Sequence, residues 1–327
     1  MKKAIMLACL GIFISVGAIA PVVAATEKIK IVIPRNSVFV LNYFGARDAG
    51  VFKKYGFDLE IDARPFKGFT ASLPAKETMV TTYSGTAAIA KINSGLDWVI
   101  IGGGLTVMQQ VVVLKDSPFK TISDMKGKRF SSWSTGAGAF KATRAVIMDG
   151  YGFDIIKDTK FVQAAPPALF KLLERGDVDS MFNISSLTVA AAAQPNKYRS
   201  IFSPNDYWKE KTGLPIIWSA PIVAWRSWVE EDRGRAKRWV QATHASYNWL
   251  RIGKNLDAVV KSHGRLAAVK NKAQAEVYKK WLGEKRVFLA RWDQKVVDNA
   301  WKFLEVAKKH GVLKKIPPKN KTAIILE

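Results

Sequence analysis

The residues best placed to bind a ligand form one short stretch, residues 134–138 (STGAG), directly after a β-type run at 130–133. A segment compatible with a helix follows at 139–148 and ends at Asp149-Gly150. Glycines let backbone N–H groups approach a ligand, hydroxyls add donors, and the positive end of a helix dipole favours an anion. The stretch therefore predicts one wall of a site for a small anionic group. The alternative is an ordinary strand-to-helix turn that binds nothing.

Neither of the common phosphate-binding motifs is present. Lys141 stands where the dinucleotide pattern G-x-G-x-x-G needs its last glycine, and G-x-x-x-x-G-K-[ST] occurs nowhere in the chain. The stretch is therefore not expected to bind a nucleotide.

The elements that must position this wall alternate between strands and helices. In the first part of the chain, polar or glycine-containing turns follow predicted strands and begin at Pro34, Pro65, Ser84 and Gly102. Ligands of open α/β sheets bind outside the carboxyl ends of the strands. Each turn alone is typical of an ordinary β-α connection, but together the four predict a cleft. The expected strands are 28–33, 59–63, 78–83 and 98–101, with helices at 40–52 and 87–92 and a further helix starting at Thr70 or Ser72.

A second α/β unit follows. It follows a β-branched run at 111–114, its expected strands are 130–133, 161–163 and 178–182, and its helices are 139–148, 169–175 and 187–193. An extended run at 215–224 then leads into a helical remainder that includes 273–282 and 293–310. The sequence therefore predicts an α/β fold with two lobes.

The first 25 residues are typical of a cleaved secretory signal peptide. Lys2 and Lys3 precede an apolar core at 4–20, and small residues at 22–25 suit cleavage after Ala24 or Ala25. An uncleaved membrane anchor is the alternative. The only cysteine, Cys9, lies in this segment, so the mature chain would have no thiol for catalysis or metal binding.

The charge balance is strongly basic. The chain carries 51 Lys and Arg against 27 Asp and Glu, and without Lys2 and Lys3 the net charge is +22. The basic residues are spread along the chain with no dense tract, and an exported protein is not expected to bind nucleic acid. We expect a general field that aids the capture of anions.

Three segments carry a resemblance to a known family. They are residues 48–61 (DAGVFKKYGFDLEI), 112–130 (VVLKDSPFKTISDMKGKRF) and 172–179 (LLERGDVD), and the second is the most specific. The chain resembles the periplasmic substrate-binding components of ABC importers, in the sulfonate, taurine and nitrate branch that also includes binders of thiamine-pyrimidine precursors and aromatic acids. It departs from the family pattern at 73–79.

The resemblance implies a two-lobed periplasmic binding protein of type II, each lobe a mixed sheet with flanking helices and the ligand cleft between the lobes. Residues 1–25 would be the signal peptide, 26–114 and 215–327 lobe one, and 115–214 lobe two. The implied partners are a small-molecule ligand and the permease subunits of an ABC transporter, with no nucleic acid and no membrane insertion after signal cleavage. No cofactor and no metal are expected.

The resemblance also implies ligand contacts in both lobes. In lobe one they are Arg35, Asn36, Ser37, Gly68, Phe69, Ser84, Gly85 and Thr86, and in lobe two they are Ser134, Thr135, Gly136, Ala137 and Asn183.

The residue types agree with parts of this set. Hydroxyls at helix starts suit carboxylate or sulfonate oxygens, and Arg35 is the expected charge partner of an anion, the alternative being a solvated loop arginine. Trp133, Trp218 and Phe69 could stack on a ring, although aromatic residues on strands also serve as core.

Catalysis is not expected. The histidines, His244, His263 and His310, all lie in the helical remainder, away from the predicted cleft, and no G-x-S-x-G or H-E-x-x-H motif occurs. We expect a periplasmic protein that captures a small carboxylate or sulfonate with a ring by lobe closure. Taurine-like, nitrate-like and neutral pyrimidine ligands, and an exported sensor or scavenger without a permease, are the alternatives.

Overall fold

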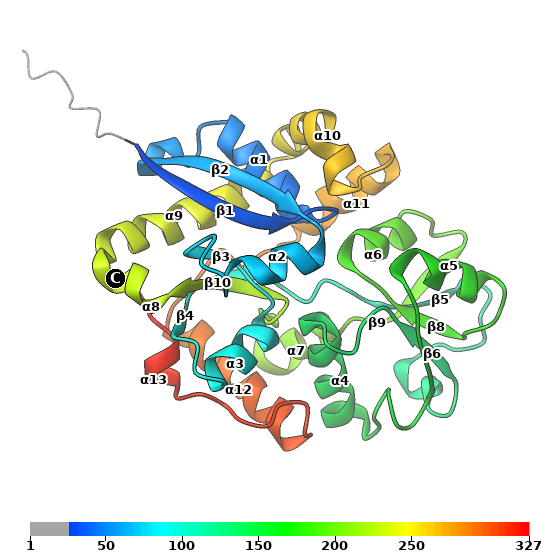
Figure 1. Cartoon of the computed structure of the whole chain (residues 1–327). Helices are drawn as coiled ribbons and strands as arrows, with labels where there is room; N and C mark the ends of the chain where they lie inside the picture. The colour runs from blue at the N-terminus through cyan, green and yellow to red at the C-terminus, as the bar shows by residue number, and fades with distance from the viewer. Residues whose placement is uncertain (1–25, 327) are drawn as a thin grey trace, which may run out of the picture.

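The computed structural model describes residues 26–326, which form two α/β lobes (Figure 1). The predicted signal peptide, residues 1–25, lies outside the described residues. Within residues 26–326, every helix is too short or too polar to cross a bilayer.

Lobe one contains two small sheets. β1 and β2 pair in parallel, while β10 lies between β3 and β4 and is antiparallel to both. The Thr78 and Thr81 hydroxyls join the sheets, because they donate to the Lys30 and Val32 carbonyls of β1 at 2.9 Å each. The elements from the first part of the chain are β1 (Glu27–Pro34), α1 (Val38–Asp48), the 3-10 helix η1 (Lys53–Tyr55), β2 (Phe57–Arg64), α2 (Phe66–Ser72), β3 (Val80–Thr82), α3 (Gly85–Asn93) and β4 (Trp98–Leu105).

Lobe two is built on one mixed sheet of five strands in the order β7-β6-β8-β5-β9. β6 runs parallel to β7 and β8, whereas β5 is antiparallel to β8 and β9. Its elements are β5 (Val111–Leu114), the 3-10 helix η2 (Ile122–Met125), β6 (Arg129–Ser132), α4 (Gly138–Tyr151), β7 (Lys160–Gln163), α5 (Pro166–Glu174), β8 (Ser180–Phe182), α6 (Ser185–Ala192), β9 (Tyr198–Phe202) and α7 (Pro204–Thr212).

The chain crosses between the lobes at residues 106–110 and returns at 213–219. The two crossing segments are bonded to each other, since the Val107 N–H donates to the Ile216 carbonyl at 3.0 Å. Because β5 pairs only within the five-stranded sheet, we propose that lobe one ends near residue 105 and not at 114.

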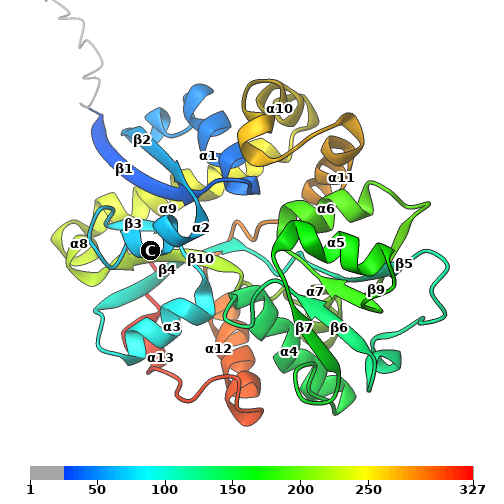
Figure 2. The ribbon, with the colours of Figure 1, turned by 45° about the vertical axis from the view of Figure 1, so that its right-hand side comes forward.

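The returning chain adds β10 and a run of helices. α9 and α10 pack on α1 of lobe one, but α12 also contacts α4, and α11 contacts α6 of lobe two (Figures 1 and 2). These helices therefore brace both lobes. Their bounds are β10 (Ala220–Trp225), α8 (Arg226–Glu231), α9 (Arg233–Leu250), α10 (Gly253–Ala267), α11 (Lys272–Gly283), α12 (Gln294–Lys309) and α13 (Lys319–Thr322).

Most expected strands and helices are confirmed in position, with corrections. The helix expected to start at Thr70 or Ser72 is wrong because α2 ends at Ser72, and the helix expected to end at Asp149-Gly150 continues to Tyr151. The run expected at 215–224 is a strand only from Ala220. The turn expected at 65–70 is the helix α2, whose N-cap is Pro65. The glycines 102–104 continue β4 and do not end it. They are needed there because neighbouring backbone comes very close: a methyl group on Gly104 would collide with the Ala220 carbonyl of β10, and one on Gly103 with the Leu289 carbonyl.

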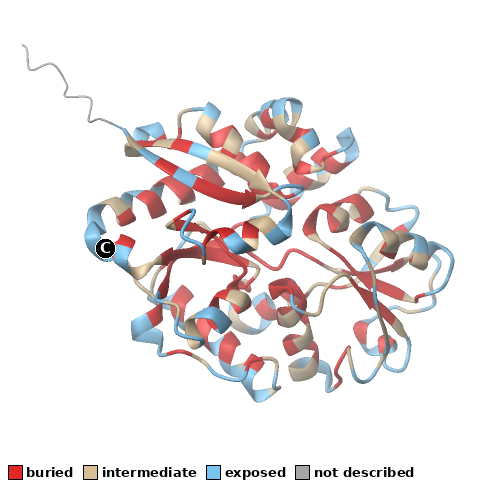
Figure 3. Ribbon diagram, in the orientation of Figure 1, coloured by how far each residue is buried: buried red, intermediate tan, exposed pale blue. Residues whose placement is uncertain are grey.

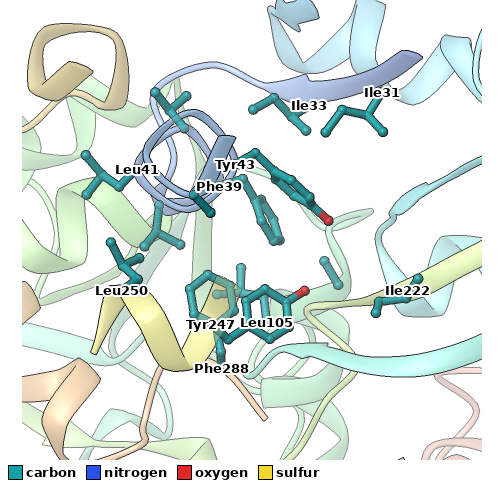
Figure 4. Close-up of a cluster of buried hydrophobic side chains, with 14 of the residues drawn as sticks. Ile31, Ile33, Phe39, Leu41, Tyr43, Leu105, Ile222, Tyr247, Leu250 and Phe288 are labelled. Atoms are coloured by element: carbon teal, nitrogen blue, oxygen red, sulfur yellow. The ribbon is translucent and has the colours of Figure 1, made fainter. Parts of the chain in front are cut away.

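The core follows the strands and the inner faces of the helices (Figure 3). In lobe one, Phe39 and Tyr43 of α1 face Tyr247 and Phe288, and the last two rings stack at 4.2 Å (Figure 4). A second core runs across the lobe boundary and includes Phe140 of α4 together with Leu304 of α12. The two lobes therefore share apolar packing on the α4 side.

Candidate functional site

A cleft of about 310 Å³ lies between the lobes, at the carboxyl ends of their strands. Its walls come from the turns after β1, β2, β3, β6, β7 and β8 and from both crossing segments. The lining residues are Pro34, Arg35, Asn36, Ser37, Phe39, Pro65, Phe66, Phe69, Ser84, Leu105, Gln109, Trp133, Ala137, Gly138, Ala139, Pro166, Ile184, Ser185, Ser219 and Ala220.

Five helices of eight residues or more begin at this cleft, but α5 starts with Pro166 and Pro167, which have no N–H, so four direct free N–H groups into it. α1 and α3 come from lobe one, and α4 and α6 come from lobe two. None of the four has a side-chain cap or an acidic residue in its first turn. Their first N–H groups and dipoles therefore remain available to an anion.

Four helices whose N-termini lie away from the cleft satisfy these groups internally, although α10, which also starts away from it, is uncapped. α7, α9, α11 and α12 are each capped by a side chain of their own N-cap residue: Ser203, Asp232, Asn271 and Asp293 respectively. Capping of this kind contributes about 1 kcal/mol to helix stability. The uncapped ends at the cleft forgo that contribution, which is expected where a ligand supplies the acceptor.

Arg35 provides a formal positive charge at the cleft. It lies in the turn after β1, is exposed, and forms no ion pair with any residue in the range 26–326. The next residue, Asn36, has φ 57° and its N–H donates to the Leu266 carbonyl of α10 at 2.9 Å, which fixes the turn. The nearby Arg64 differs because it is paired with Asp62 and Glu77. Arg35 is thus the free guanidinium of the cleft.

Aromatic rings form the apolar wall. Phe66, which is 48% exposed, meets Trp133 edge-on across the cleft with ring centroids 5.7 Å apart. Phe69 and Phe39 line the same cavity from lobe one and are almost fully buried. The pair Phe66 and Trp133 joins α2 of lobe one to the turn after β6 of lobe two, so a flat apolar group could be enclosed between the lobes.

Three buried polar atoms on lining residues have no partner in the described part of the chain. They are the Ser84 hydroxyl, at the N-cap of α3, Oε1 of Gln109, in the crossing segment, and the indole Nε1 of Trp133, after β6. Buried polar groups of folded proteins are nearly always hydrogen-bonded to protein, water or a ligand. All three atoms are therefore candidate ligand contacts.

The structure brings together part of the predicted site. Seven predicted residues line the cleft: Arg35, Asn36, Ser37, Phe69, Ser84, Trp133 and Ala137. Eight do not: Gly68, Gly85, Thr86, Ser134, Thr135, Gly136, Asn183 and Trp218.

The residues outside the lining have other partners. Trp218 is fully buried, packs on Trp301 and donates its indole N–H to the Ala300 carbonyl at 3.0 Å, so it belongs to the core. Asn183 donates to the Pro166 carbonyl at 3.0 Å and accepts from the Ile184 N–H at 2.9 Å, which ties together the starts of α5 and α6.

Only the last two residues of the predicted wall at 134–138 line the cleft, namely Ala137 and Gly138. The Ser134 hydroxyl accepts the Gly136 N–H at 3.2 Å, and this local bond closes the turn. Gly138, the first residue of α4, lines the cleft against Ser84. Gly85 and Thr86 lie behind Ser84, because Gly85 packs against the Trp218 ring and Thr86 is fully buried.

Several lining residues were missed. Phe39 and Phe66 lie in the first turns of α1 and α2, where an aromatic residue is indistinguishable from core. Gln109 carried a usable signal, since it interrupts the apolar run around the first crossing segment. Its place in the cleft, however, depends on where the chain crosses between lobes.

The cleft lining is poor in reactive groups. None of its residues is Asp, Glu, His, Cys or Lys, and the histidines lie on α9, on α10 and after α12. Within residues 26–326, no group of three or more His, Cys, Asp or Glu side chains is arranged to hold a metal ion.

Comparison with known proteins gives one family and a consistent set of folds. The family model described as NMT1/THI5 like matches residues 39–251. No curated protein sequence matches the chain.

Among solved structures, the periplasmic aliphatic sulphonate binding protein SsuA from Escherichia coli has a TM-score of 0.73 at 14% identity, covering 93% of this chain and 94% of that one. The alkanesulfonate-binding protein SsuA from Xanthomonas axonopodis pv. citri, bound to MOPS, has a TM-score of 0.65 at 12% identity, covering 90% and 96%. A mutant of the desulfurization enzyme DszB in complex with biphenyl-2-sulfinic acid has a TM-score of 0.63 at 14% identity, covering 91% and 96%. At these identities the likeness establishes the fold, the two-lobed type II periplasmic binding fold expected from the sequence.

Proposed function

We propose that this chain, which belongs to the NMT1/THI5-like family, captures a small organic anion with an apolar body between its two lobes. The observation that carries the proposal is the convergence of four uncapped helix N-termini and the unpaired Arg35 on one cleft with aromatic walls. A sulfonate or carboxylate can accept from these donors, while Phe39, Phe66, Phe69 and Trp133 enclose the apolar part.

Binding by closure follows from the distribution of the donors. Two of the helix N-termini belong to each lobe, so only the closed arrangement lets one anion use all of them. A ligand shifts the equilibrium between open and closed states by its differential affinity for them. The resemblance of the fold to SsuA supports a periplasmic location and delivery of the ligand to the permease of an ABC importer.

We propose binding and not catalysis. DszB shows that this fold also serves an enzyme. The lining of the present cleft offers serine hydroxyls but no carboxylate, imidazole or thiol that could act as base or nucleophile. Turnover of a sulfinate or sulfonate by the purified protein would overturn this part of the proposal.

The test is calorimetric titration of ligand-free protein with alkanesulfonates, arylsulfonates, the corresponding carboxylates, nitrate and neutral pyrimidines. We expect one anionic class to bind, and Arg35→Gln to weaken it by about 1.5–3 kcal/mol, roughly 10- to 150-fold, through loss of a charge-assisted hydrogen bond. Arg233→Gln is the matched control, because Arg233 is an exposed arginine at the start of α9 that does not line the cleft. It removes the same net charge and should leave affinity unchanged.

Two results would count against the proposal. Equal loss in Arg35→Gln and Arg233→Gln would mean that the general positive field attracts the anion and that Arg35 makes no contact. Binding of neutral pyrimidines alone would point to the thiamine-precursor type of ligand.

A further inference from the structure

Gln109 is held in place by the segment that carries it. The first crossing segment is bonded to the second by the Val107 N–H, and the Thr106 N–H donates to the Val287 carbonyl at 2.9 Å. Neighbouring Val107, Met108 and Val111 are buried. The Gln109 side chain lines the cleft, is only 5% exposed, and projects from a backbone that these bonds hold in place.

The Gln109 amide has a chemical requirement that an anion does not meet. Its buried Oε1 accepts no hydrogen bond from any residue in the range 26–326. Sulfonate and carboxylate oxygens only accept hydrogen bonds, so they cannot satisfy this atom. In this orientation of the amide, the partner carries an O–H or N–H.

The rest of the lining narrows the partner to a neutral group. An ammonium ion would need a compensating carboxylate, and none lines the cleft. A hydroxyl also suits either orientation of the amide, because it both donates and accepts.

We propose that Gln109 determines ligand specificity by pairing with a neutral hydroxyl or N–H group, and that the ligand class is therefore hydroxylated aromatic or cyclic anions. This inference rests on the proposed function and deepens it. It disfavours simple aliphatic sulfonates, which have no donor, and taurine-like ligands, whose donor is charged.

The test compares benzenesulfonate and benzoate with their ortho, meta and para hydroxy derivatives by calorimetry on the purified protein. We expect at least one hydroxy isomer to bind at least tenfold more tightly than its parent. A difference of this size corresponds roughly to the free energy of one buried hydrogen bond. Gln109→Met keeps the length and volume of the side chain but removes the amide. It should reduce the preference for the hydroxy isomer over its parent to within about threefold.

The matched control is Gln194→Met. Gln194 is exposed after α6, lies outside the cleft, and donates to the Ala190 carbonyl. It should keep the full hydroxyl preference. Circular dichroism and melting temperature confirm that both variants are folded.

The outcomes separate this inference from the proposed function. If the wild-type protein binds the parent and the hydroxy isomers equally, Gln109 does not pair with a donor group of the ligand. The inference then fails while anion capture stands. This result does not depend on whether Gln109→Met folds. A preference that persists in Gln109→Met also overturns it. Binding of none of these anions overturns the proposed function and this inference with it.

Discussion

A single methyl group added at Gly138 should disturb the cleft. Gly138 is the first residue of α4, and a Cβ there would lie 2.7 Å from the Ser84 hydroxyl oxygen and 2.8 Å from the Trp218 carbonyl oxygen. The Ser84 side chain can rotate away, but the carbonyl is backbone in the second crossing segment. In Gly138→Ala, α4 must therefore move away from lobe one.

The size of the effect follows from two opposing contributions. Overpacking of this kind costs about 1–3 kcal/mol. Alanine is favoured over glycine inside a helix by about 1 kcal/mol, and by less at its first residue. We expect Gly138→Ala to lower the free energy of unfolding by about 1–2 kcal/mol. Because Ser84 and residues 137–139 line the cleft together, ligand affinity should fall about tenfold, equivalent to about 1.4 kcal/mol.

Gly136→Ala is the control for this experiment. Gly136 lies in the same turn, but the nearest atom to an added Cβ is the Ser134 hydroxyl oxygen at 3.7 Å, an ordinary contact. Urea unfolding and calorimetric titration of both variants measure stability and affinity separately. If Gly138→Ala is as stable and binds as tightly as Gly136→Ala, the close packing of α4 against Ser84 and Trp218 is refuted.

Two further predictions concern stability. Burial alone would raise the pKa of Asp154, but hydrogen bonds from Arg144 and the Ile156 N–H lower it below its ordinary value of 3.8. Asp154→Asn should therefore lower the free energy of unfolding at neutral pH, measured in urea, by about 3 kcal/mol. That contribution is complete above the ordinary carboxyl pKa and lost as the pH falls below it, so an equal deficit at pH 2 would contradict the assignment. Burial lowers the pKa of His244 from 6.5 to about 4. The His244 imidazole is protonated between pH 7 and 5 in the unfolded chain but stays neutral in the folded one, so the free energy of unfolding should fall by about 2 kcal/mol over this range. His244→Gln should remove this part of the pH dependence of stability. An unchanged pH dependence would show that His244 is not the group responsible.

The sequence by itself determined the fold class and much of the element order. Strands such as 98–101 are apolar on both faces, and the turn residues that follow most strands mark where each one ends. Local signals of this kind survive in any tertiary context. They also placed Arg35, Ser84 and Ala137 in the cleft, because a strand-end turn in an α/β sheet faces the binding edge.

Only the tertiary structure decided which side of each turn faces the ligand. Trp218 and Phe39 are both aromatic residues near an element boundary, yet one is core beneath Trp301 and the other lines the cleft. Gly136 and Gly138 stand two residues apart, and only Gly138 touches the opposite lobe. The place of Gln109 in the cleft could not be predicted from the sequence, because it depends on where the chain crosses between the lobes. Local sequence fixes backbone conformation through steric and hydrogen-bonding preferences, but the partner of a side chain depends on contacts between residues distant in the chain, and these exist only once the two lobes have packed.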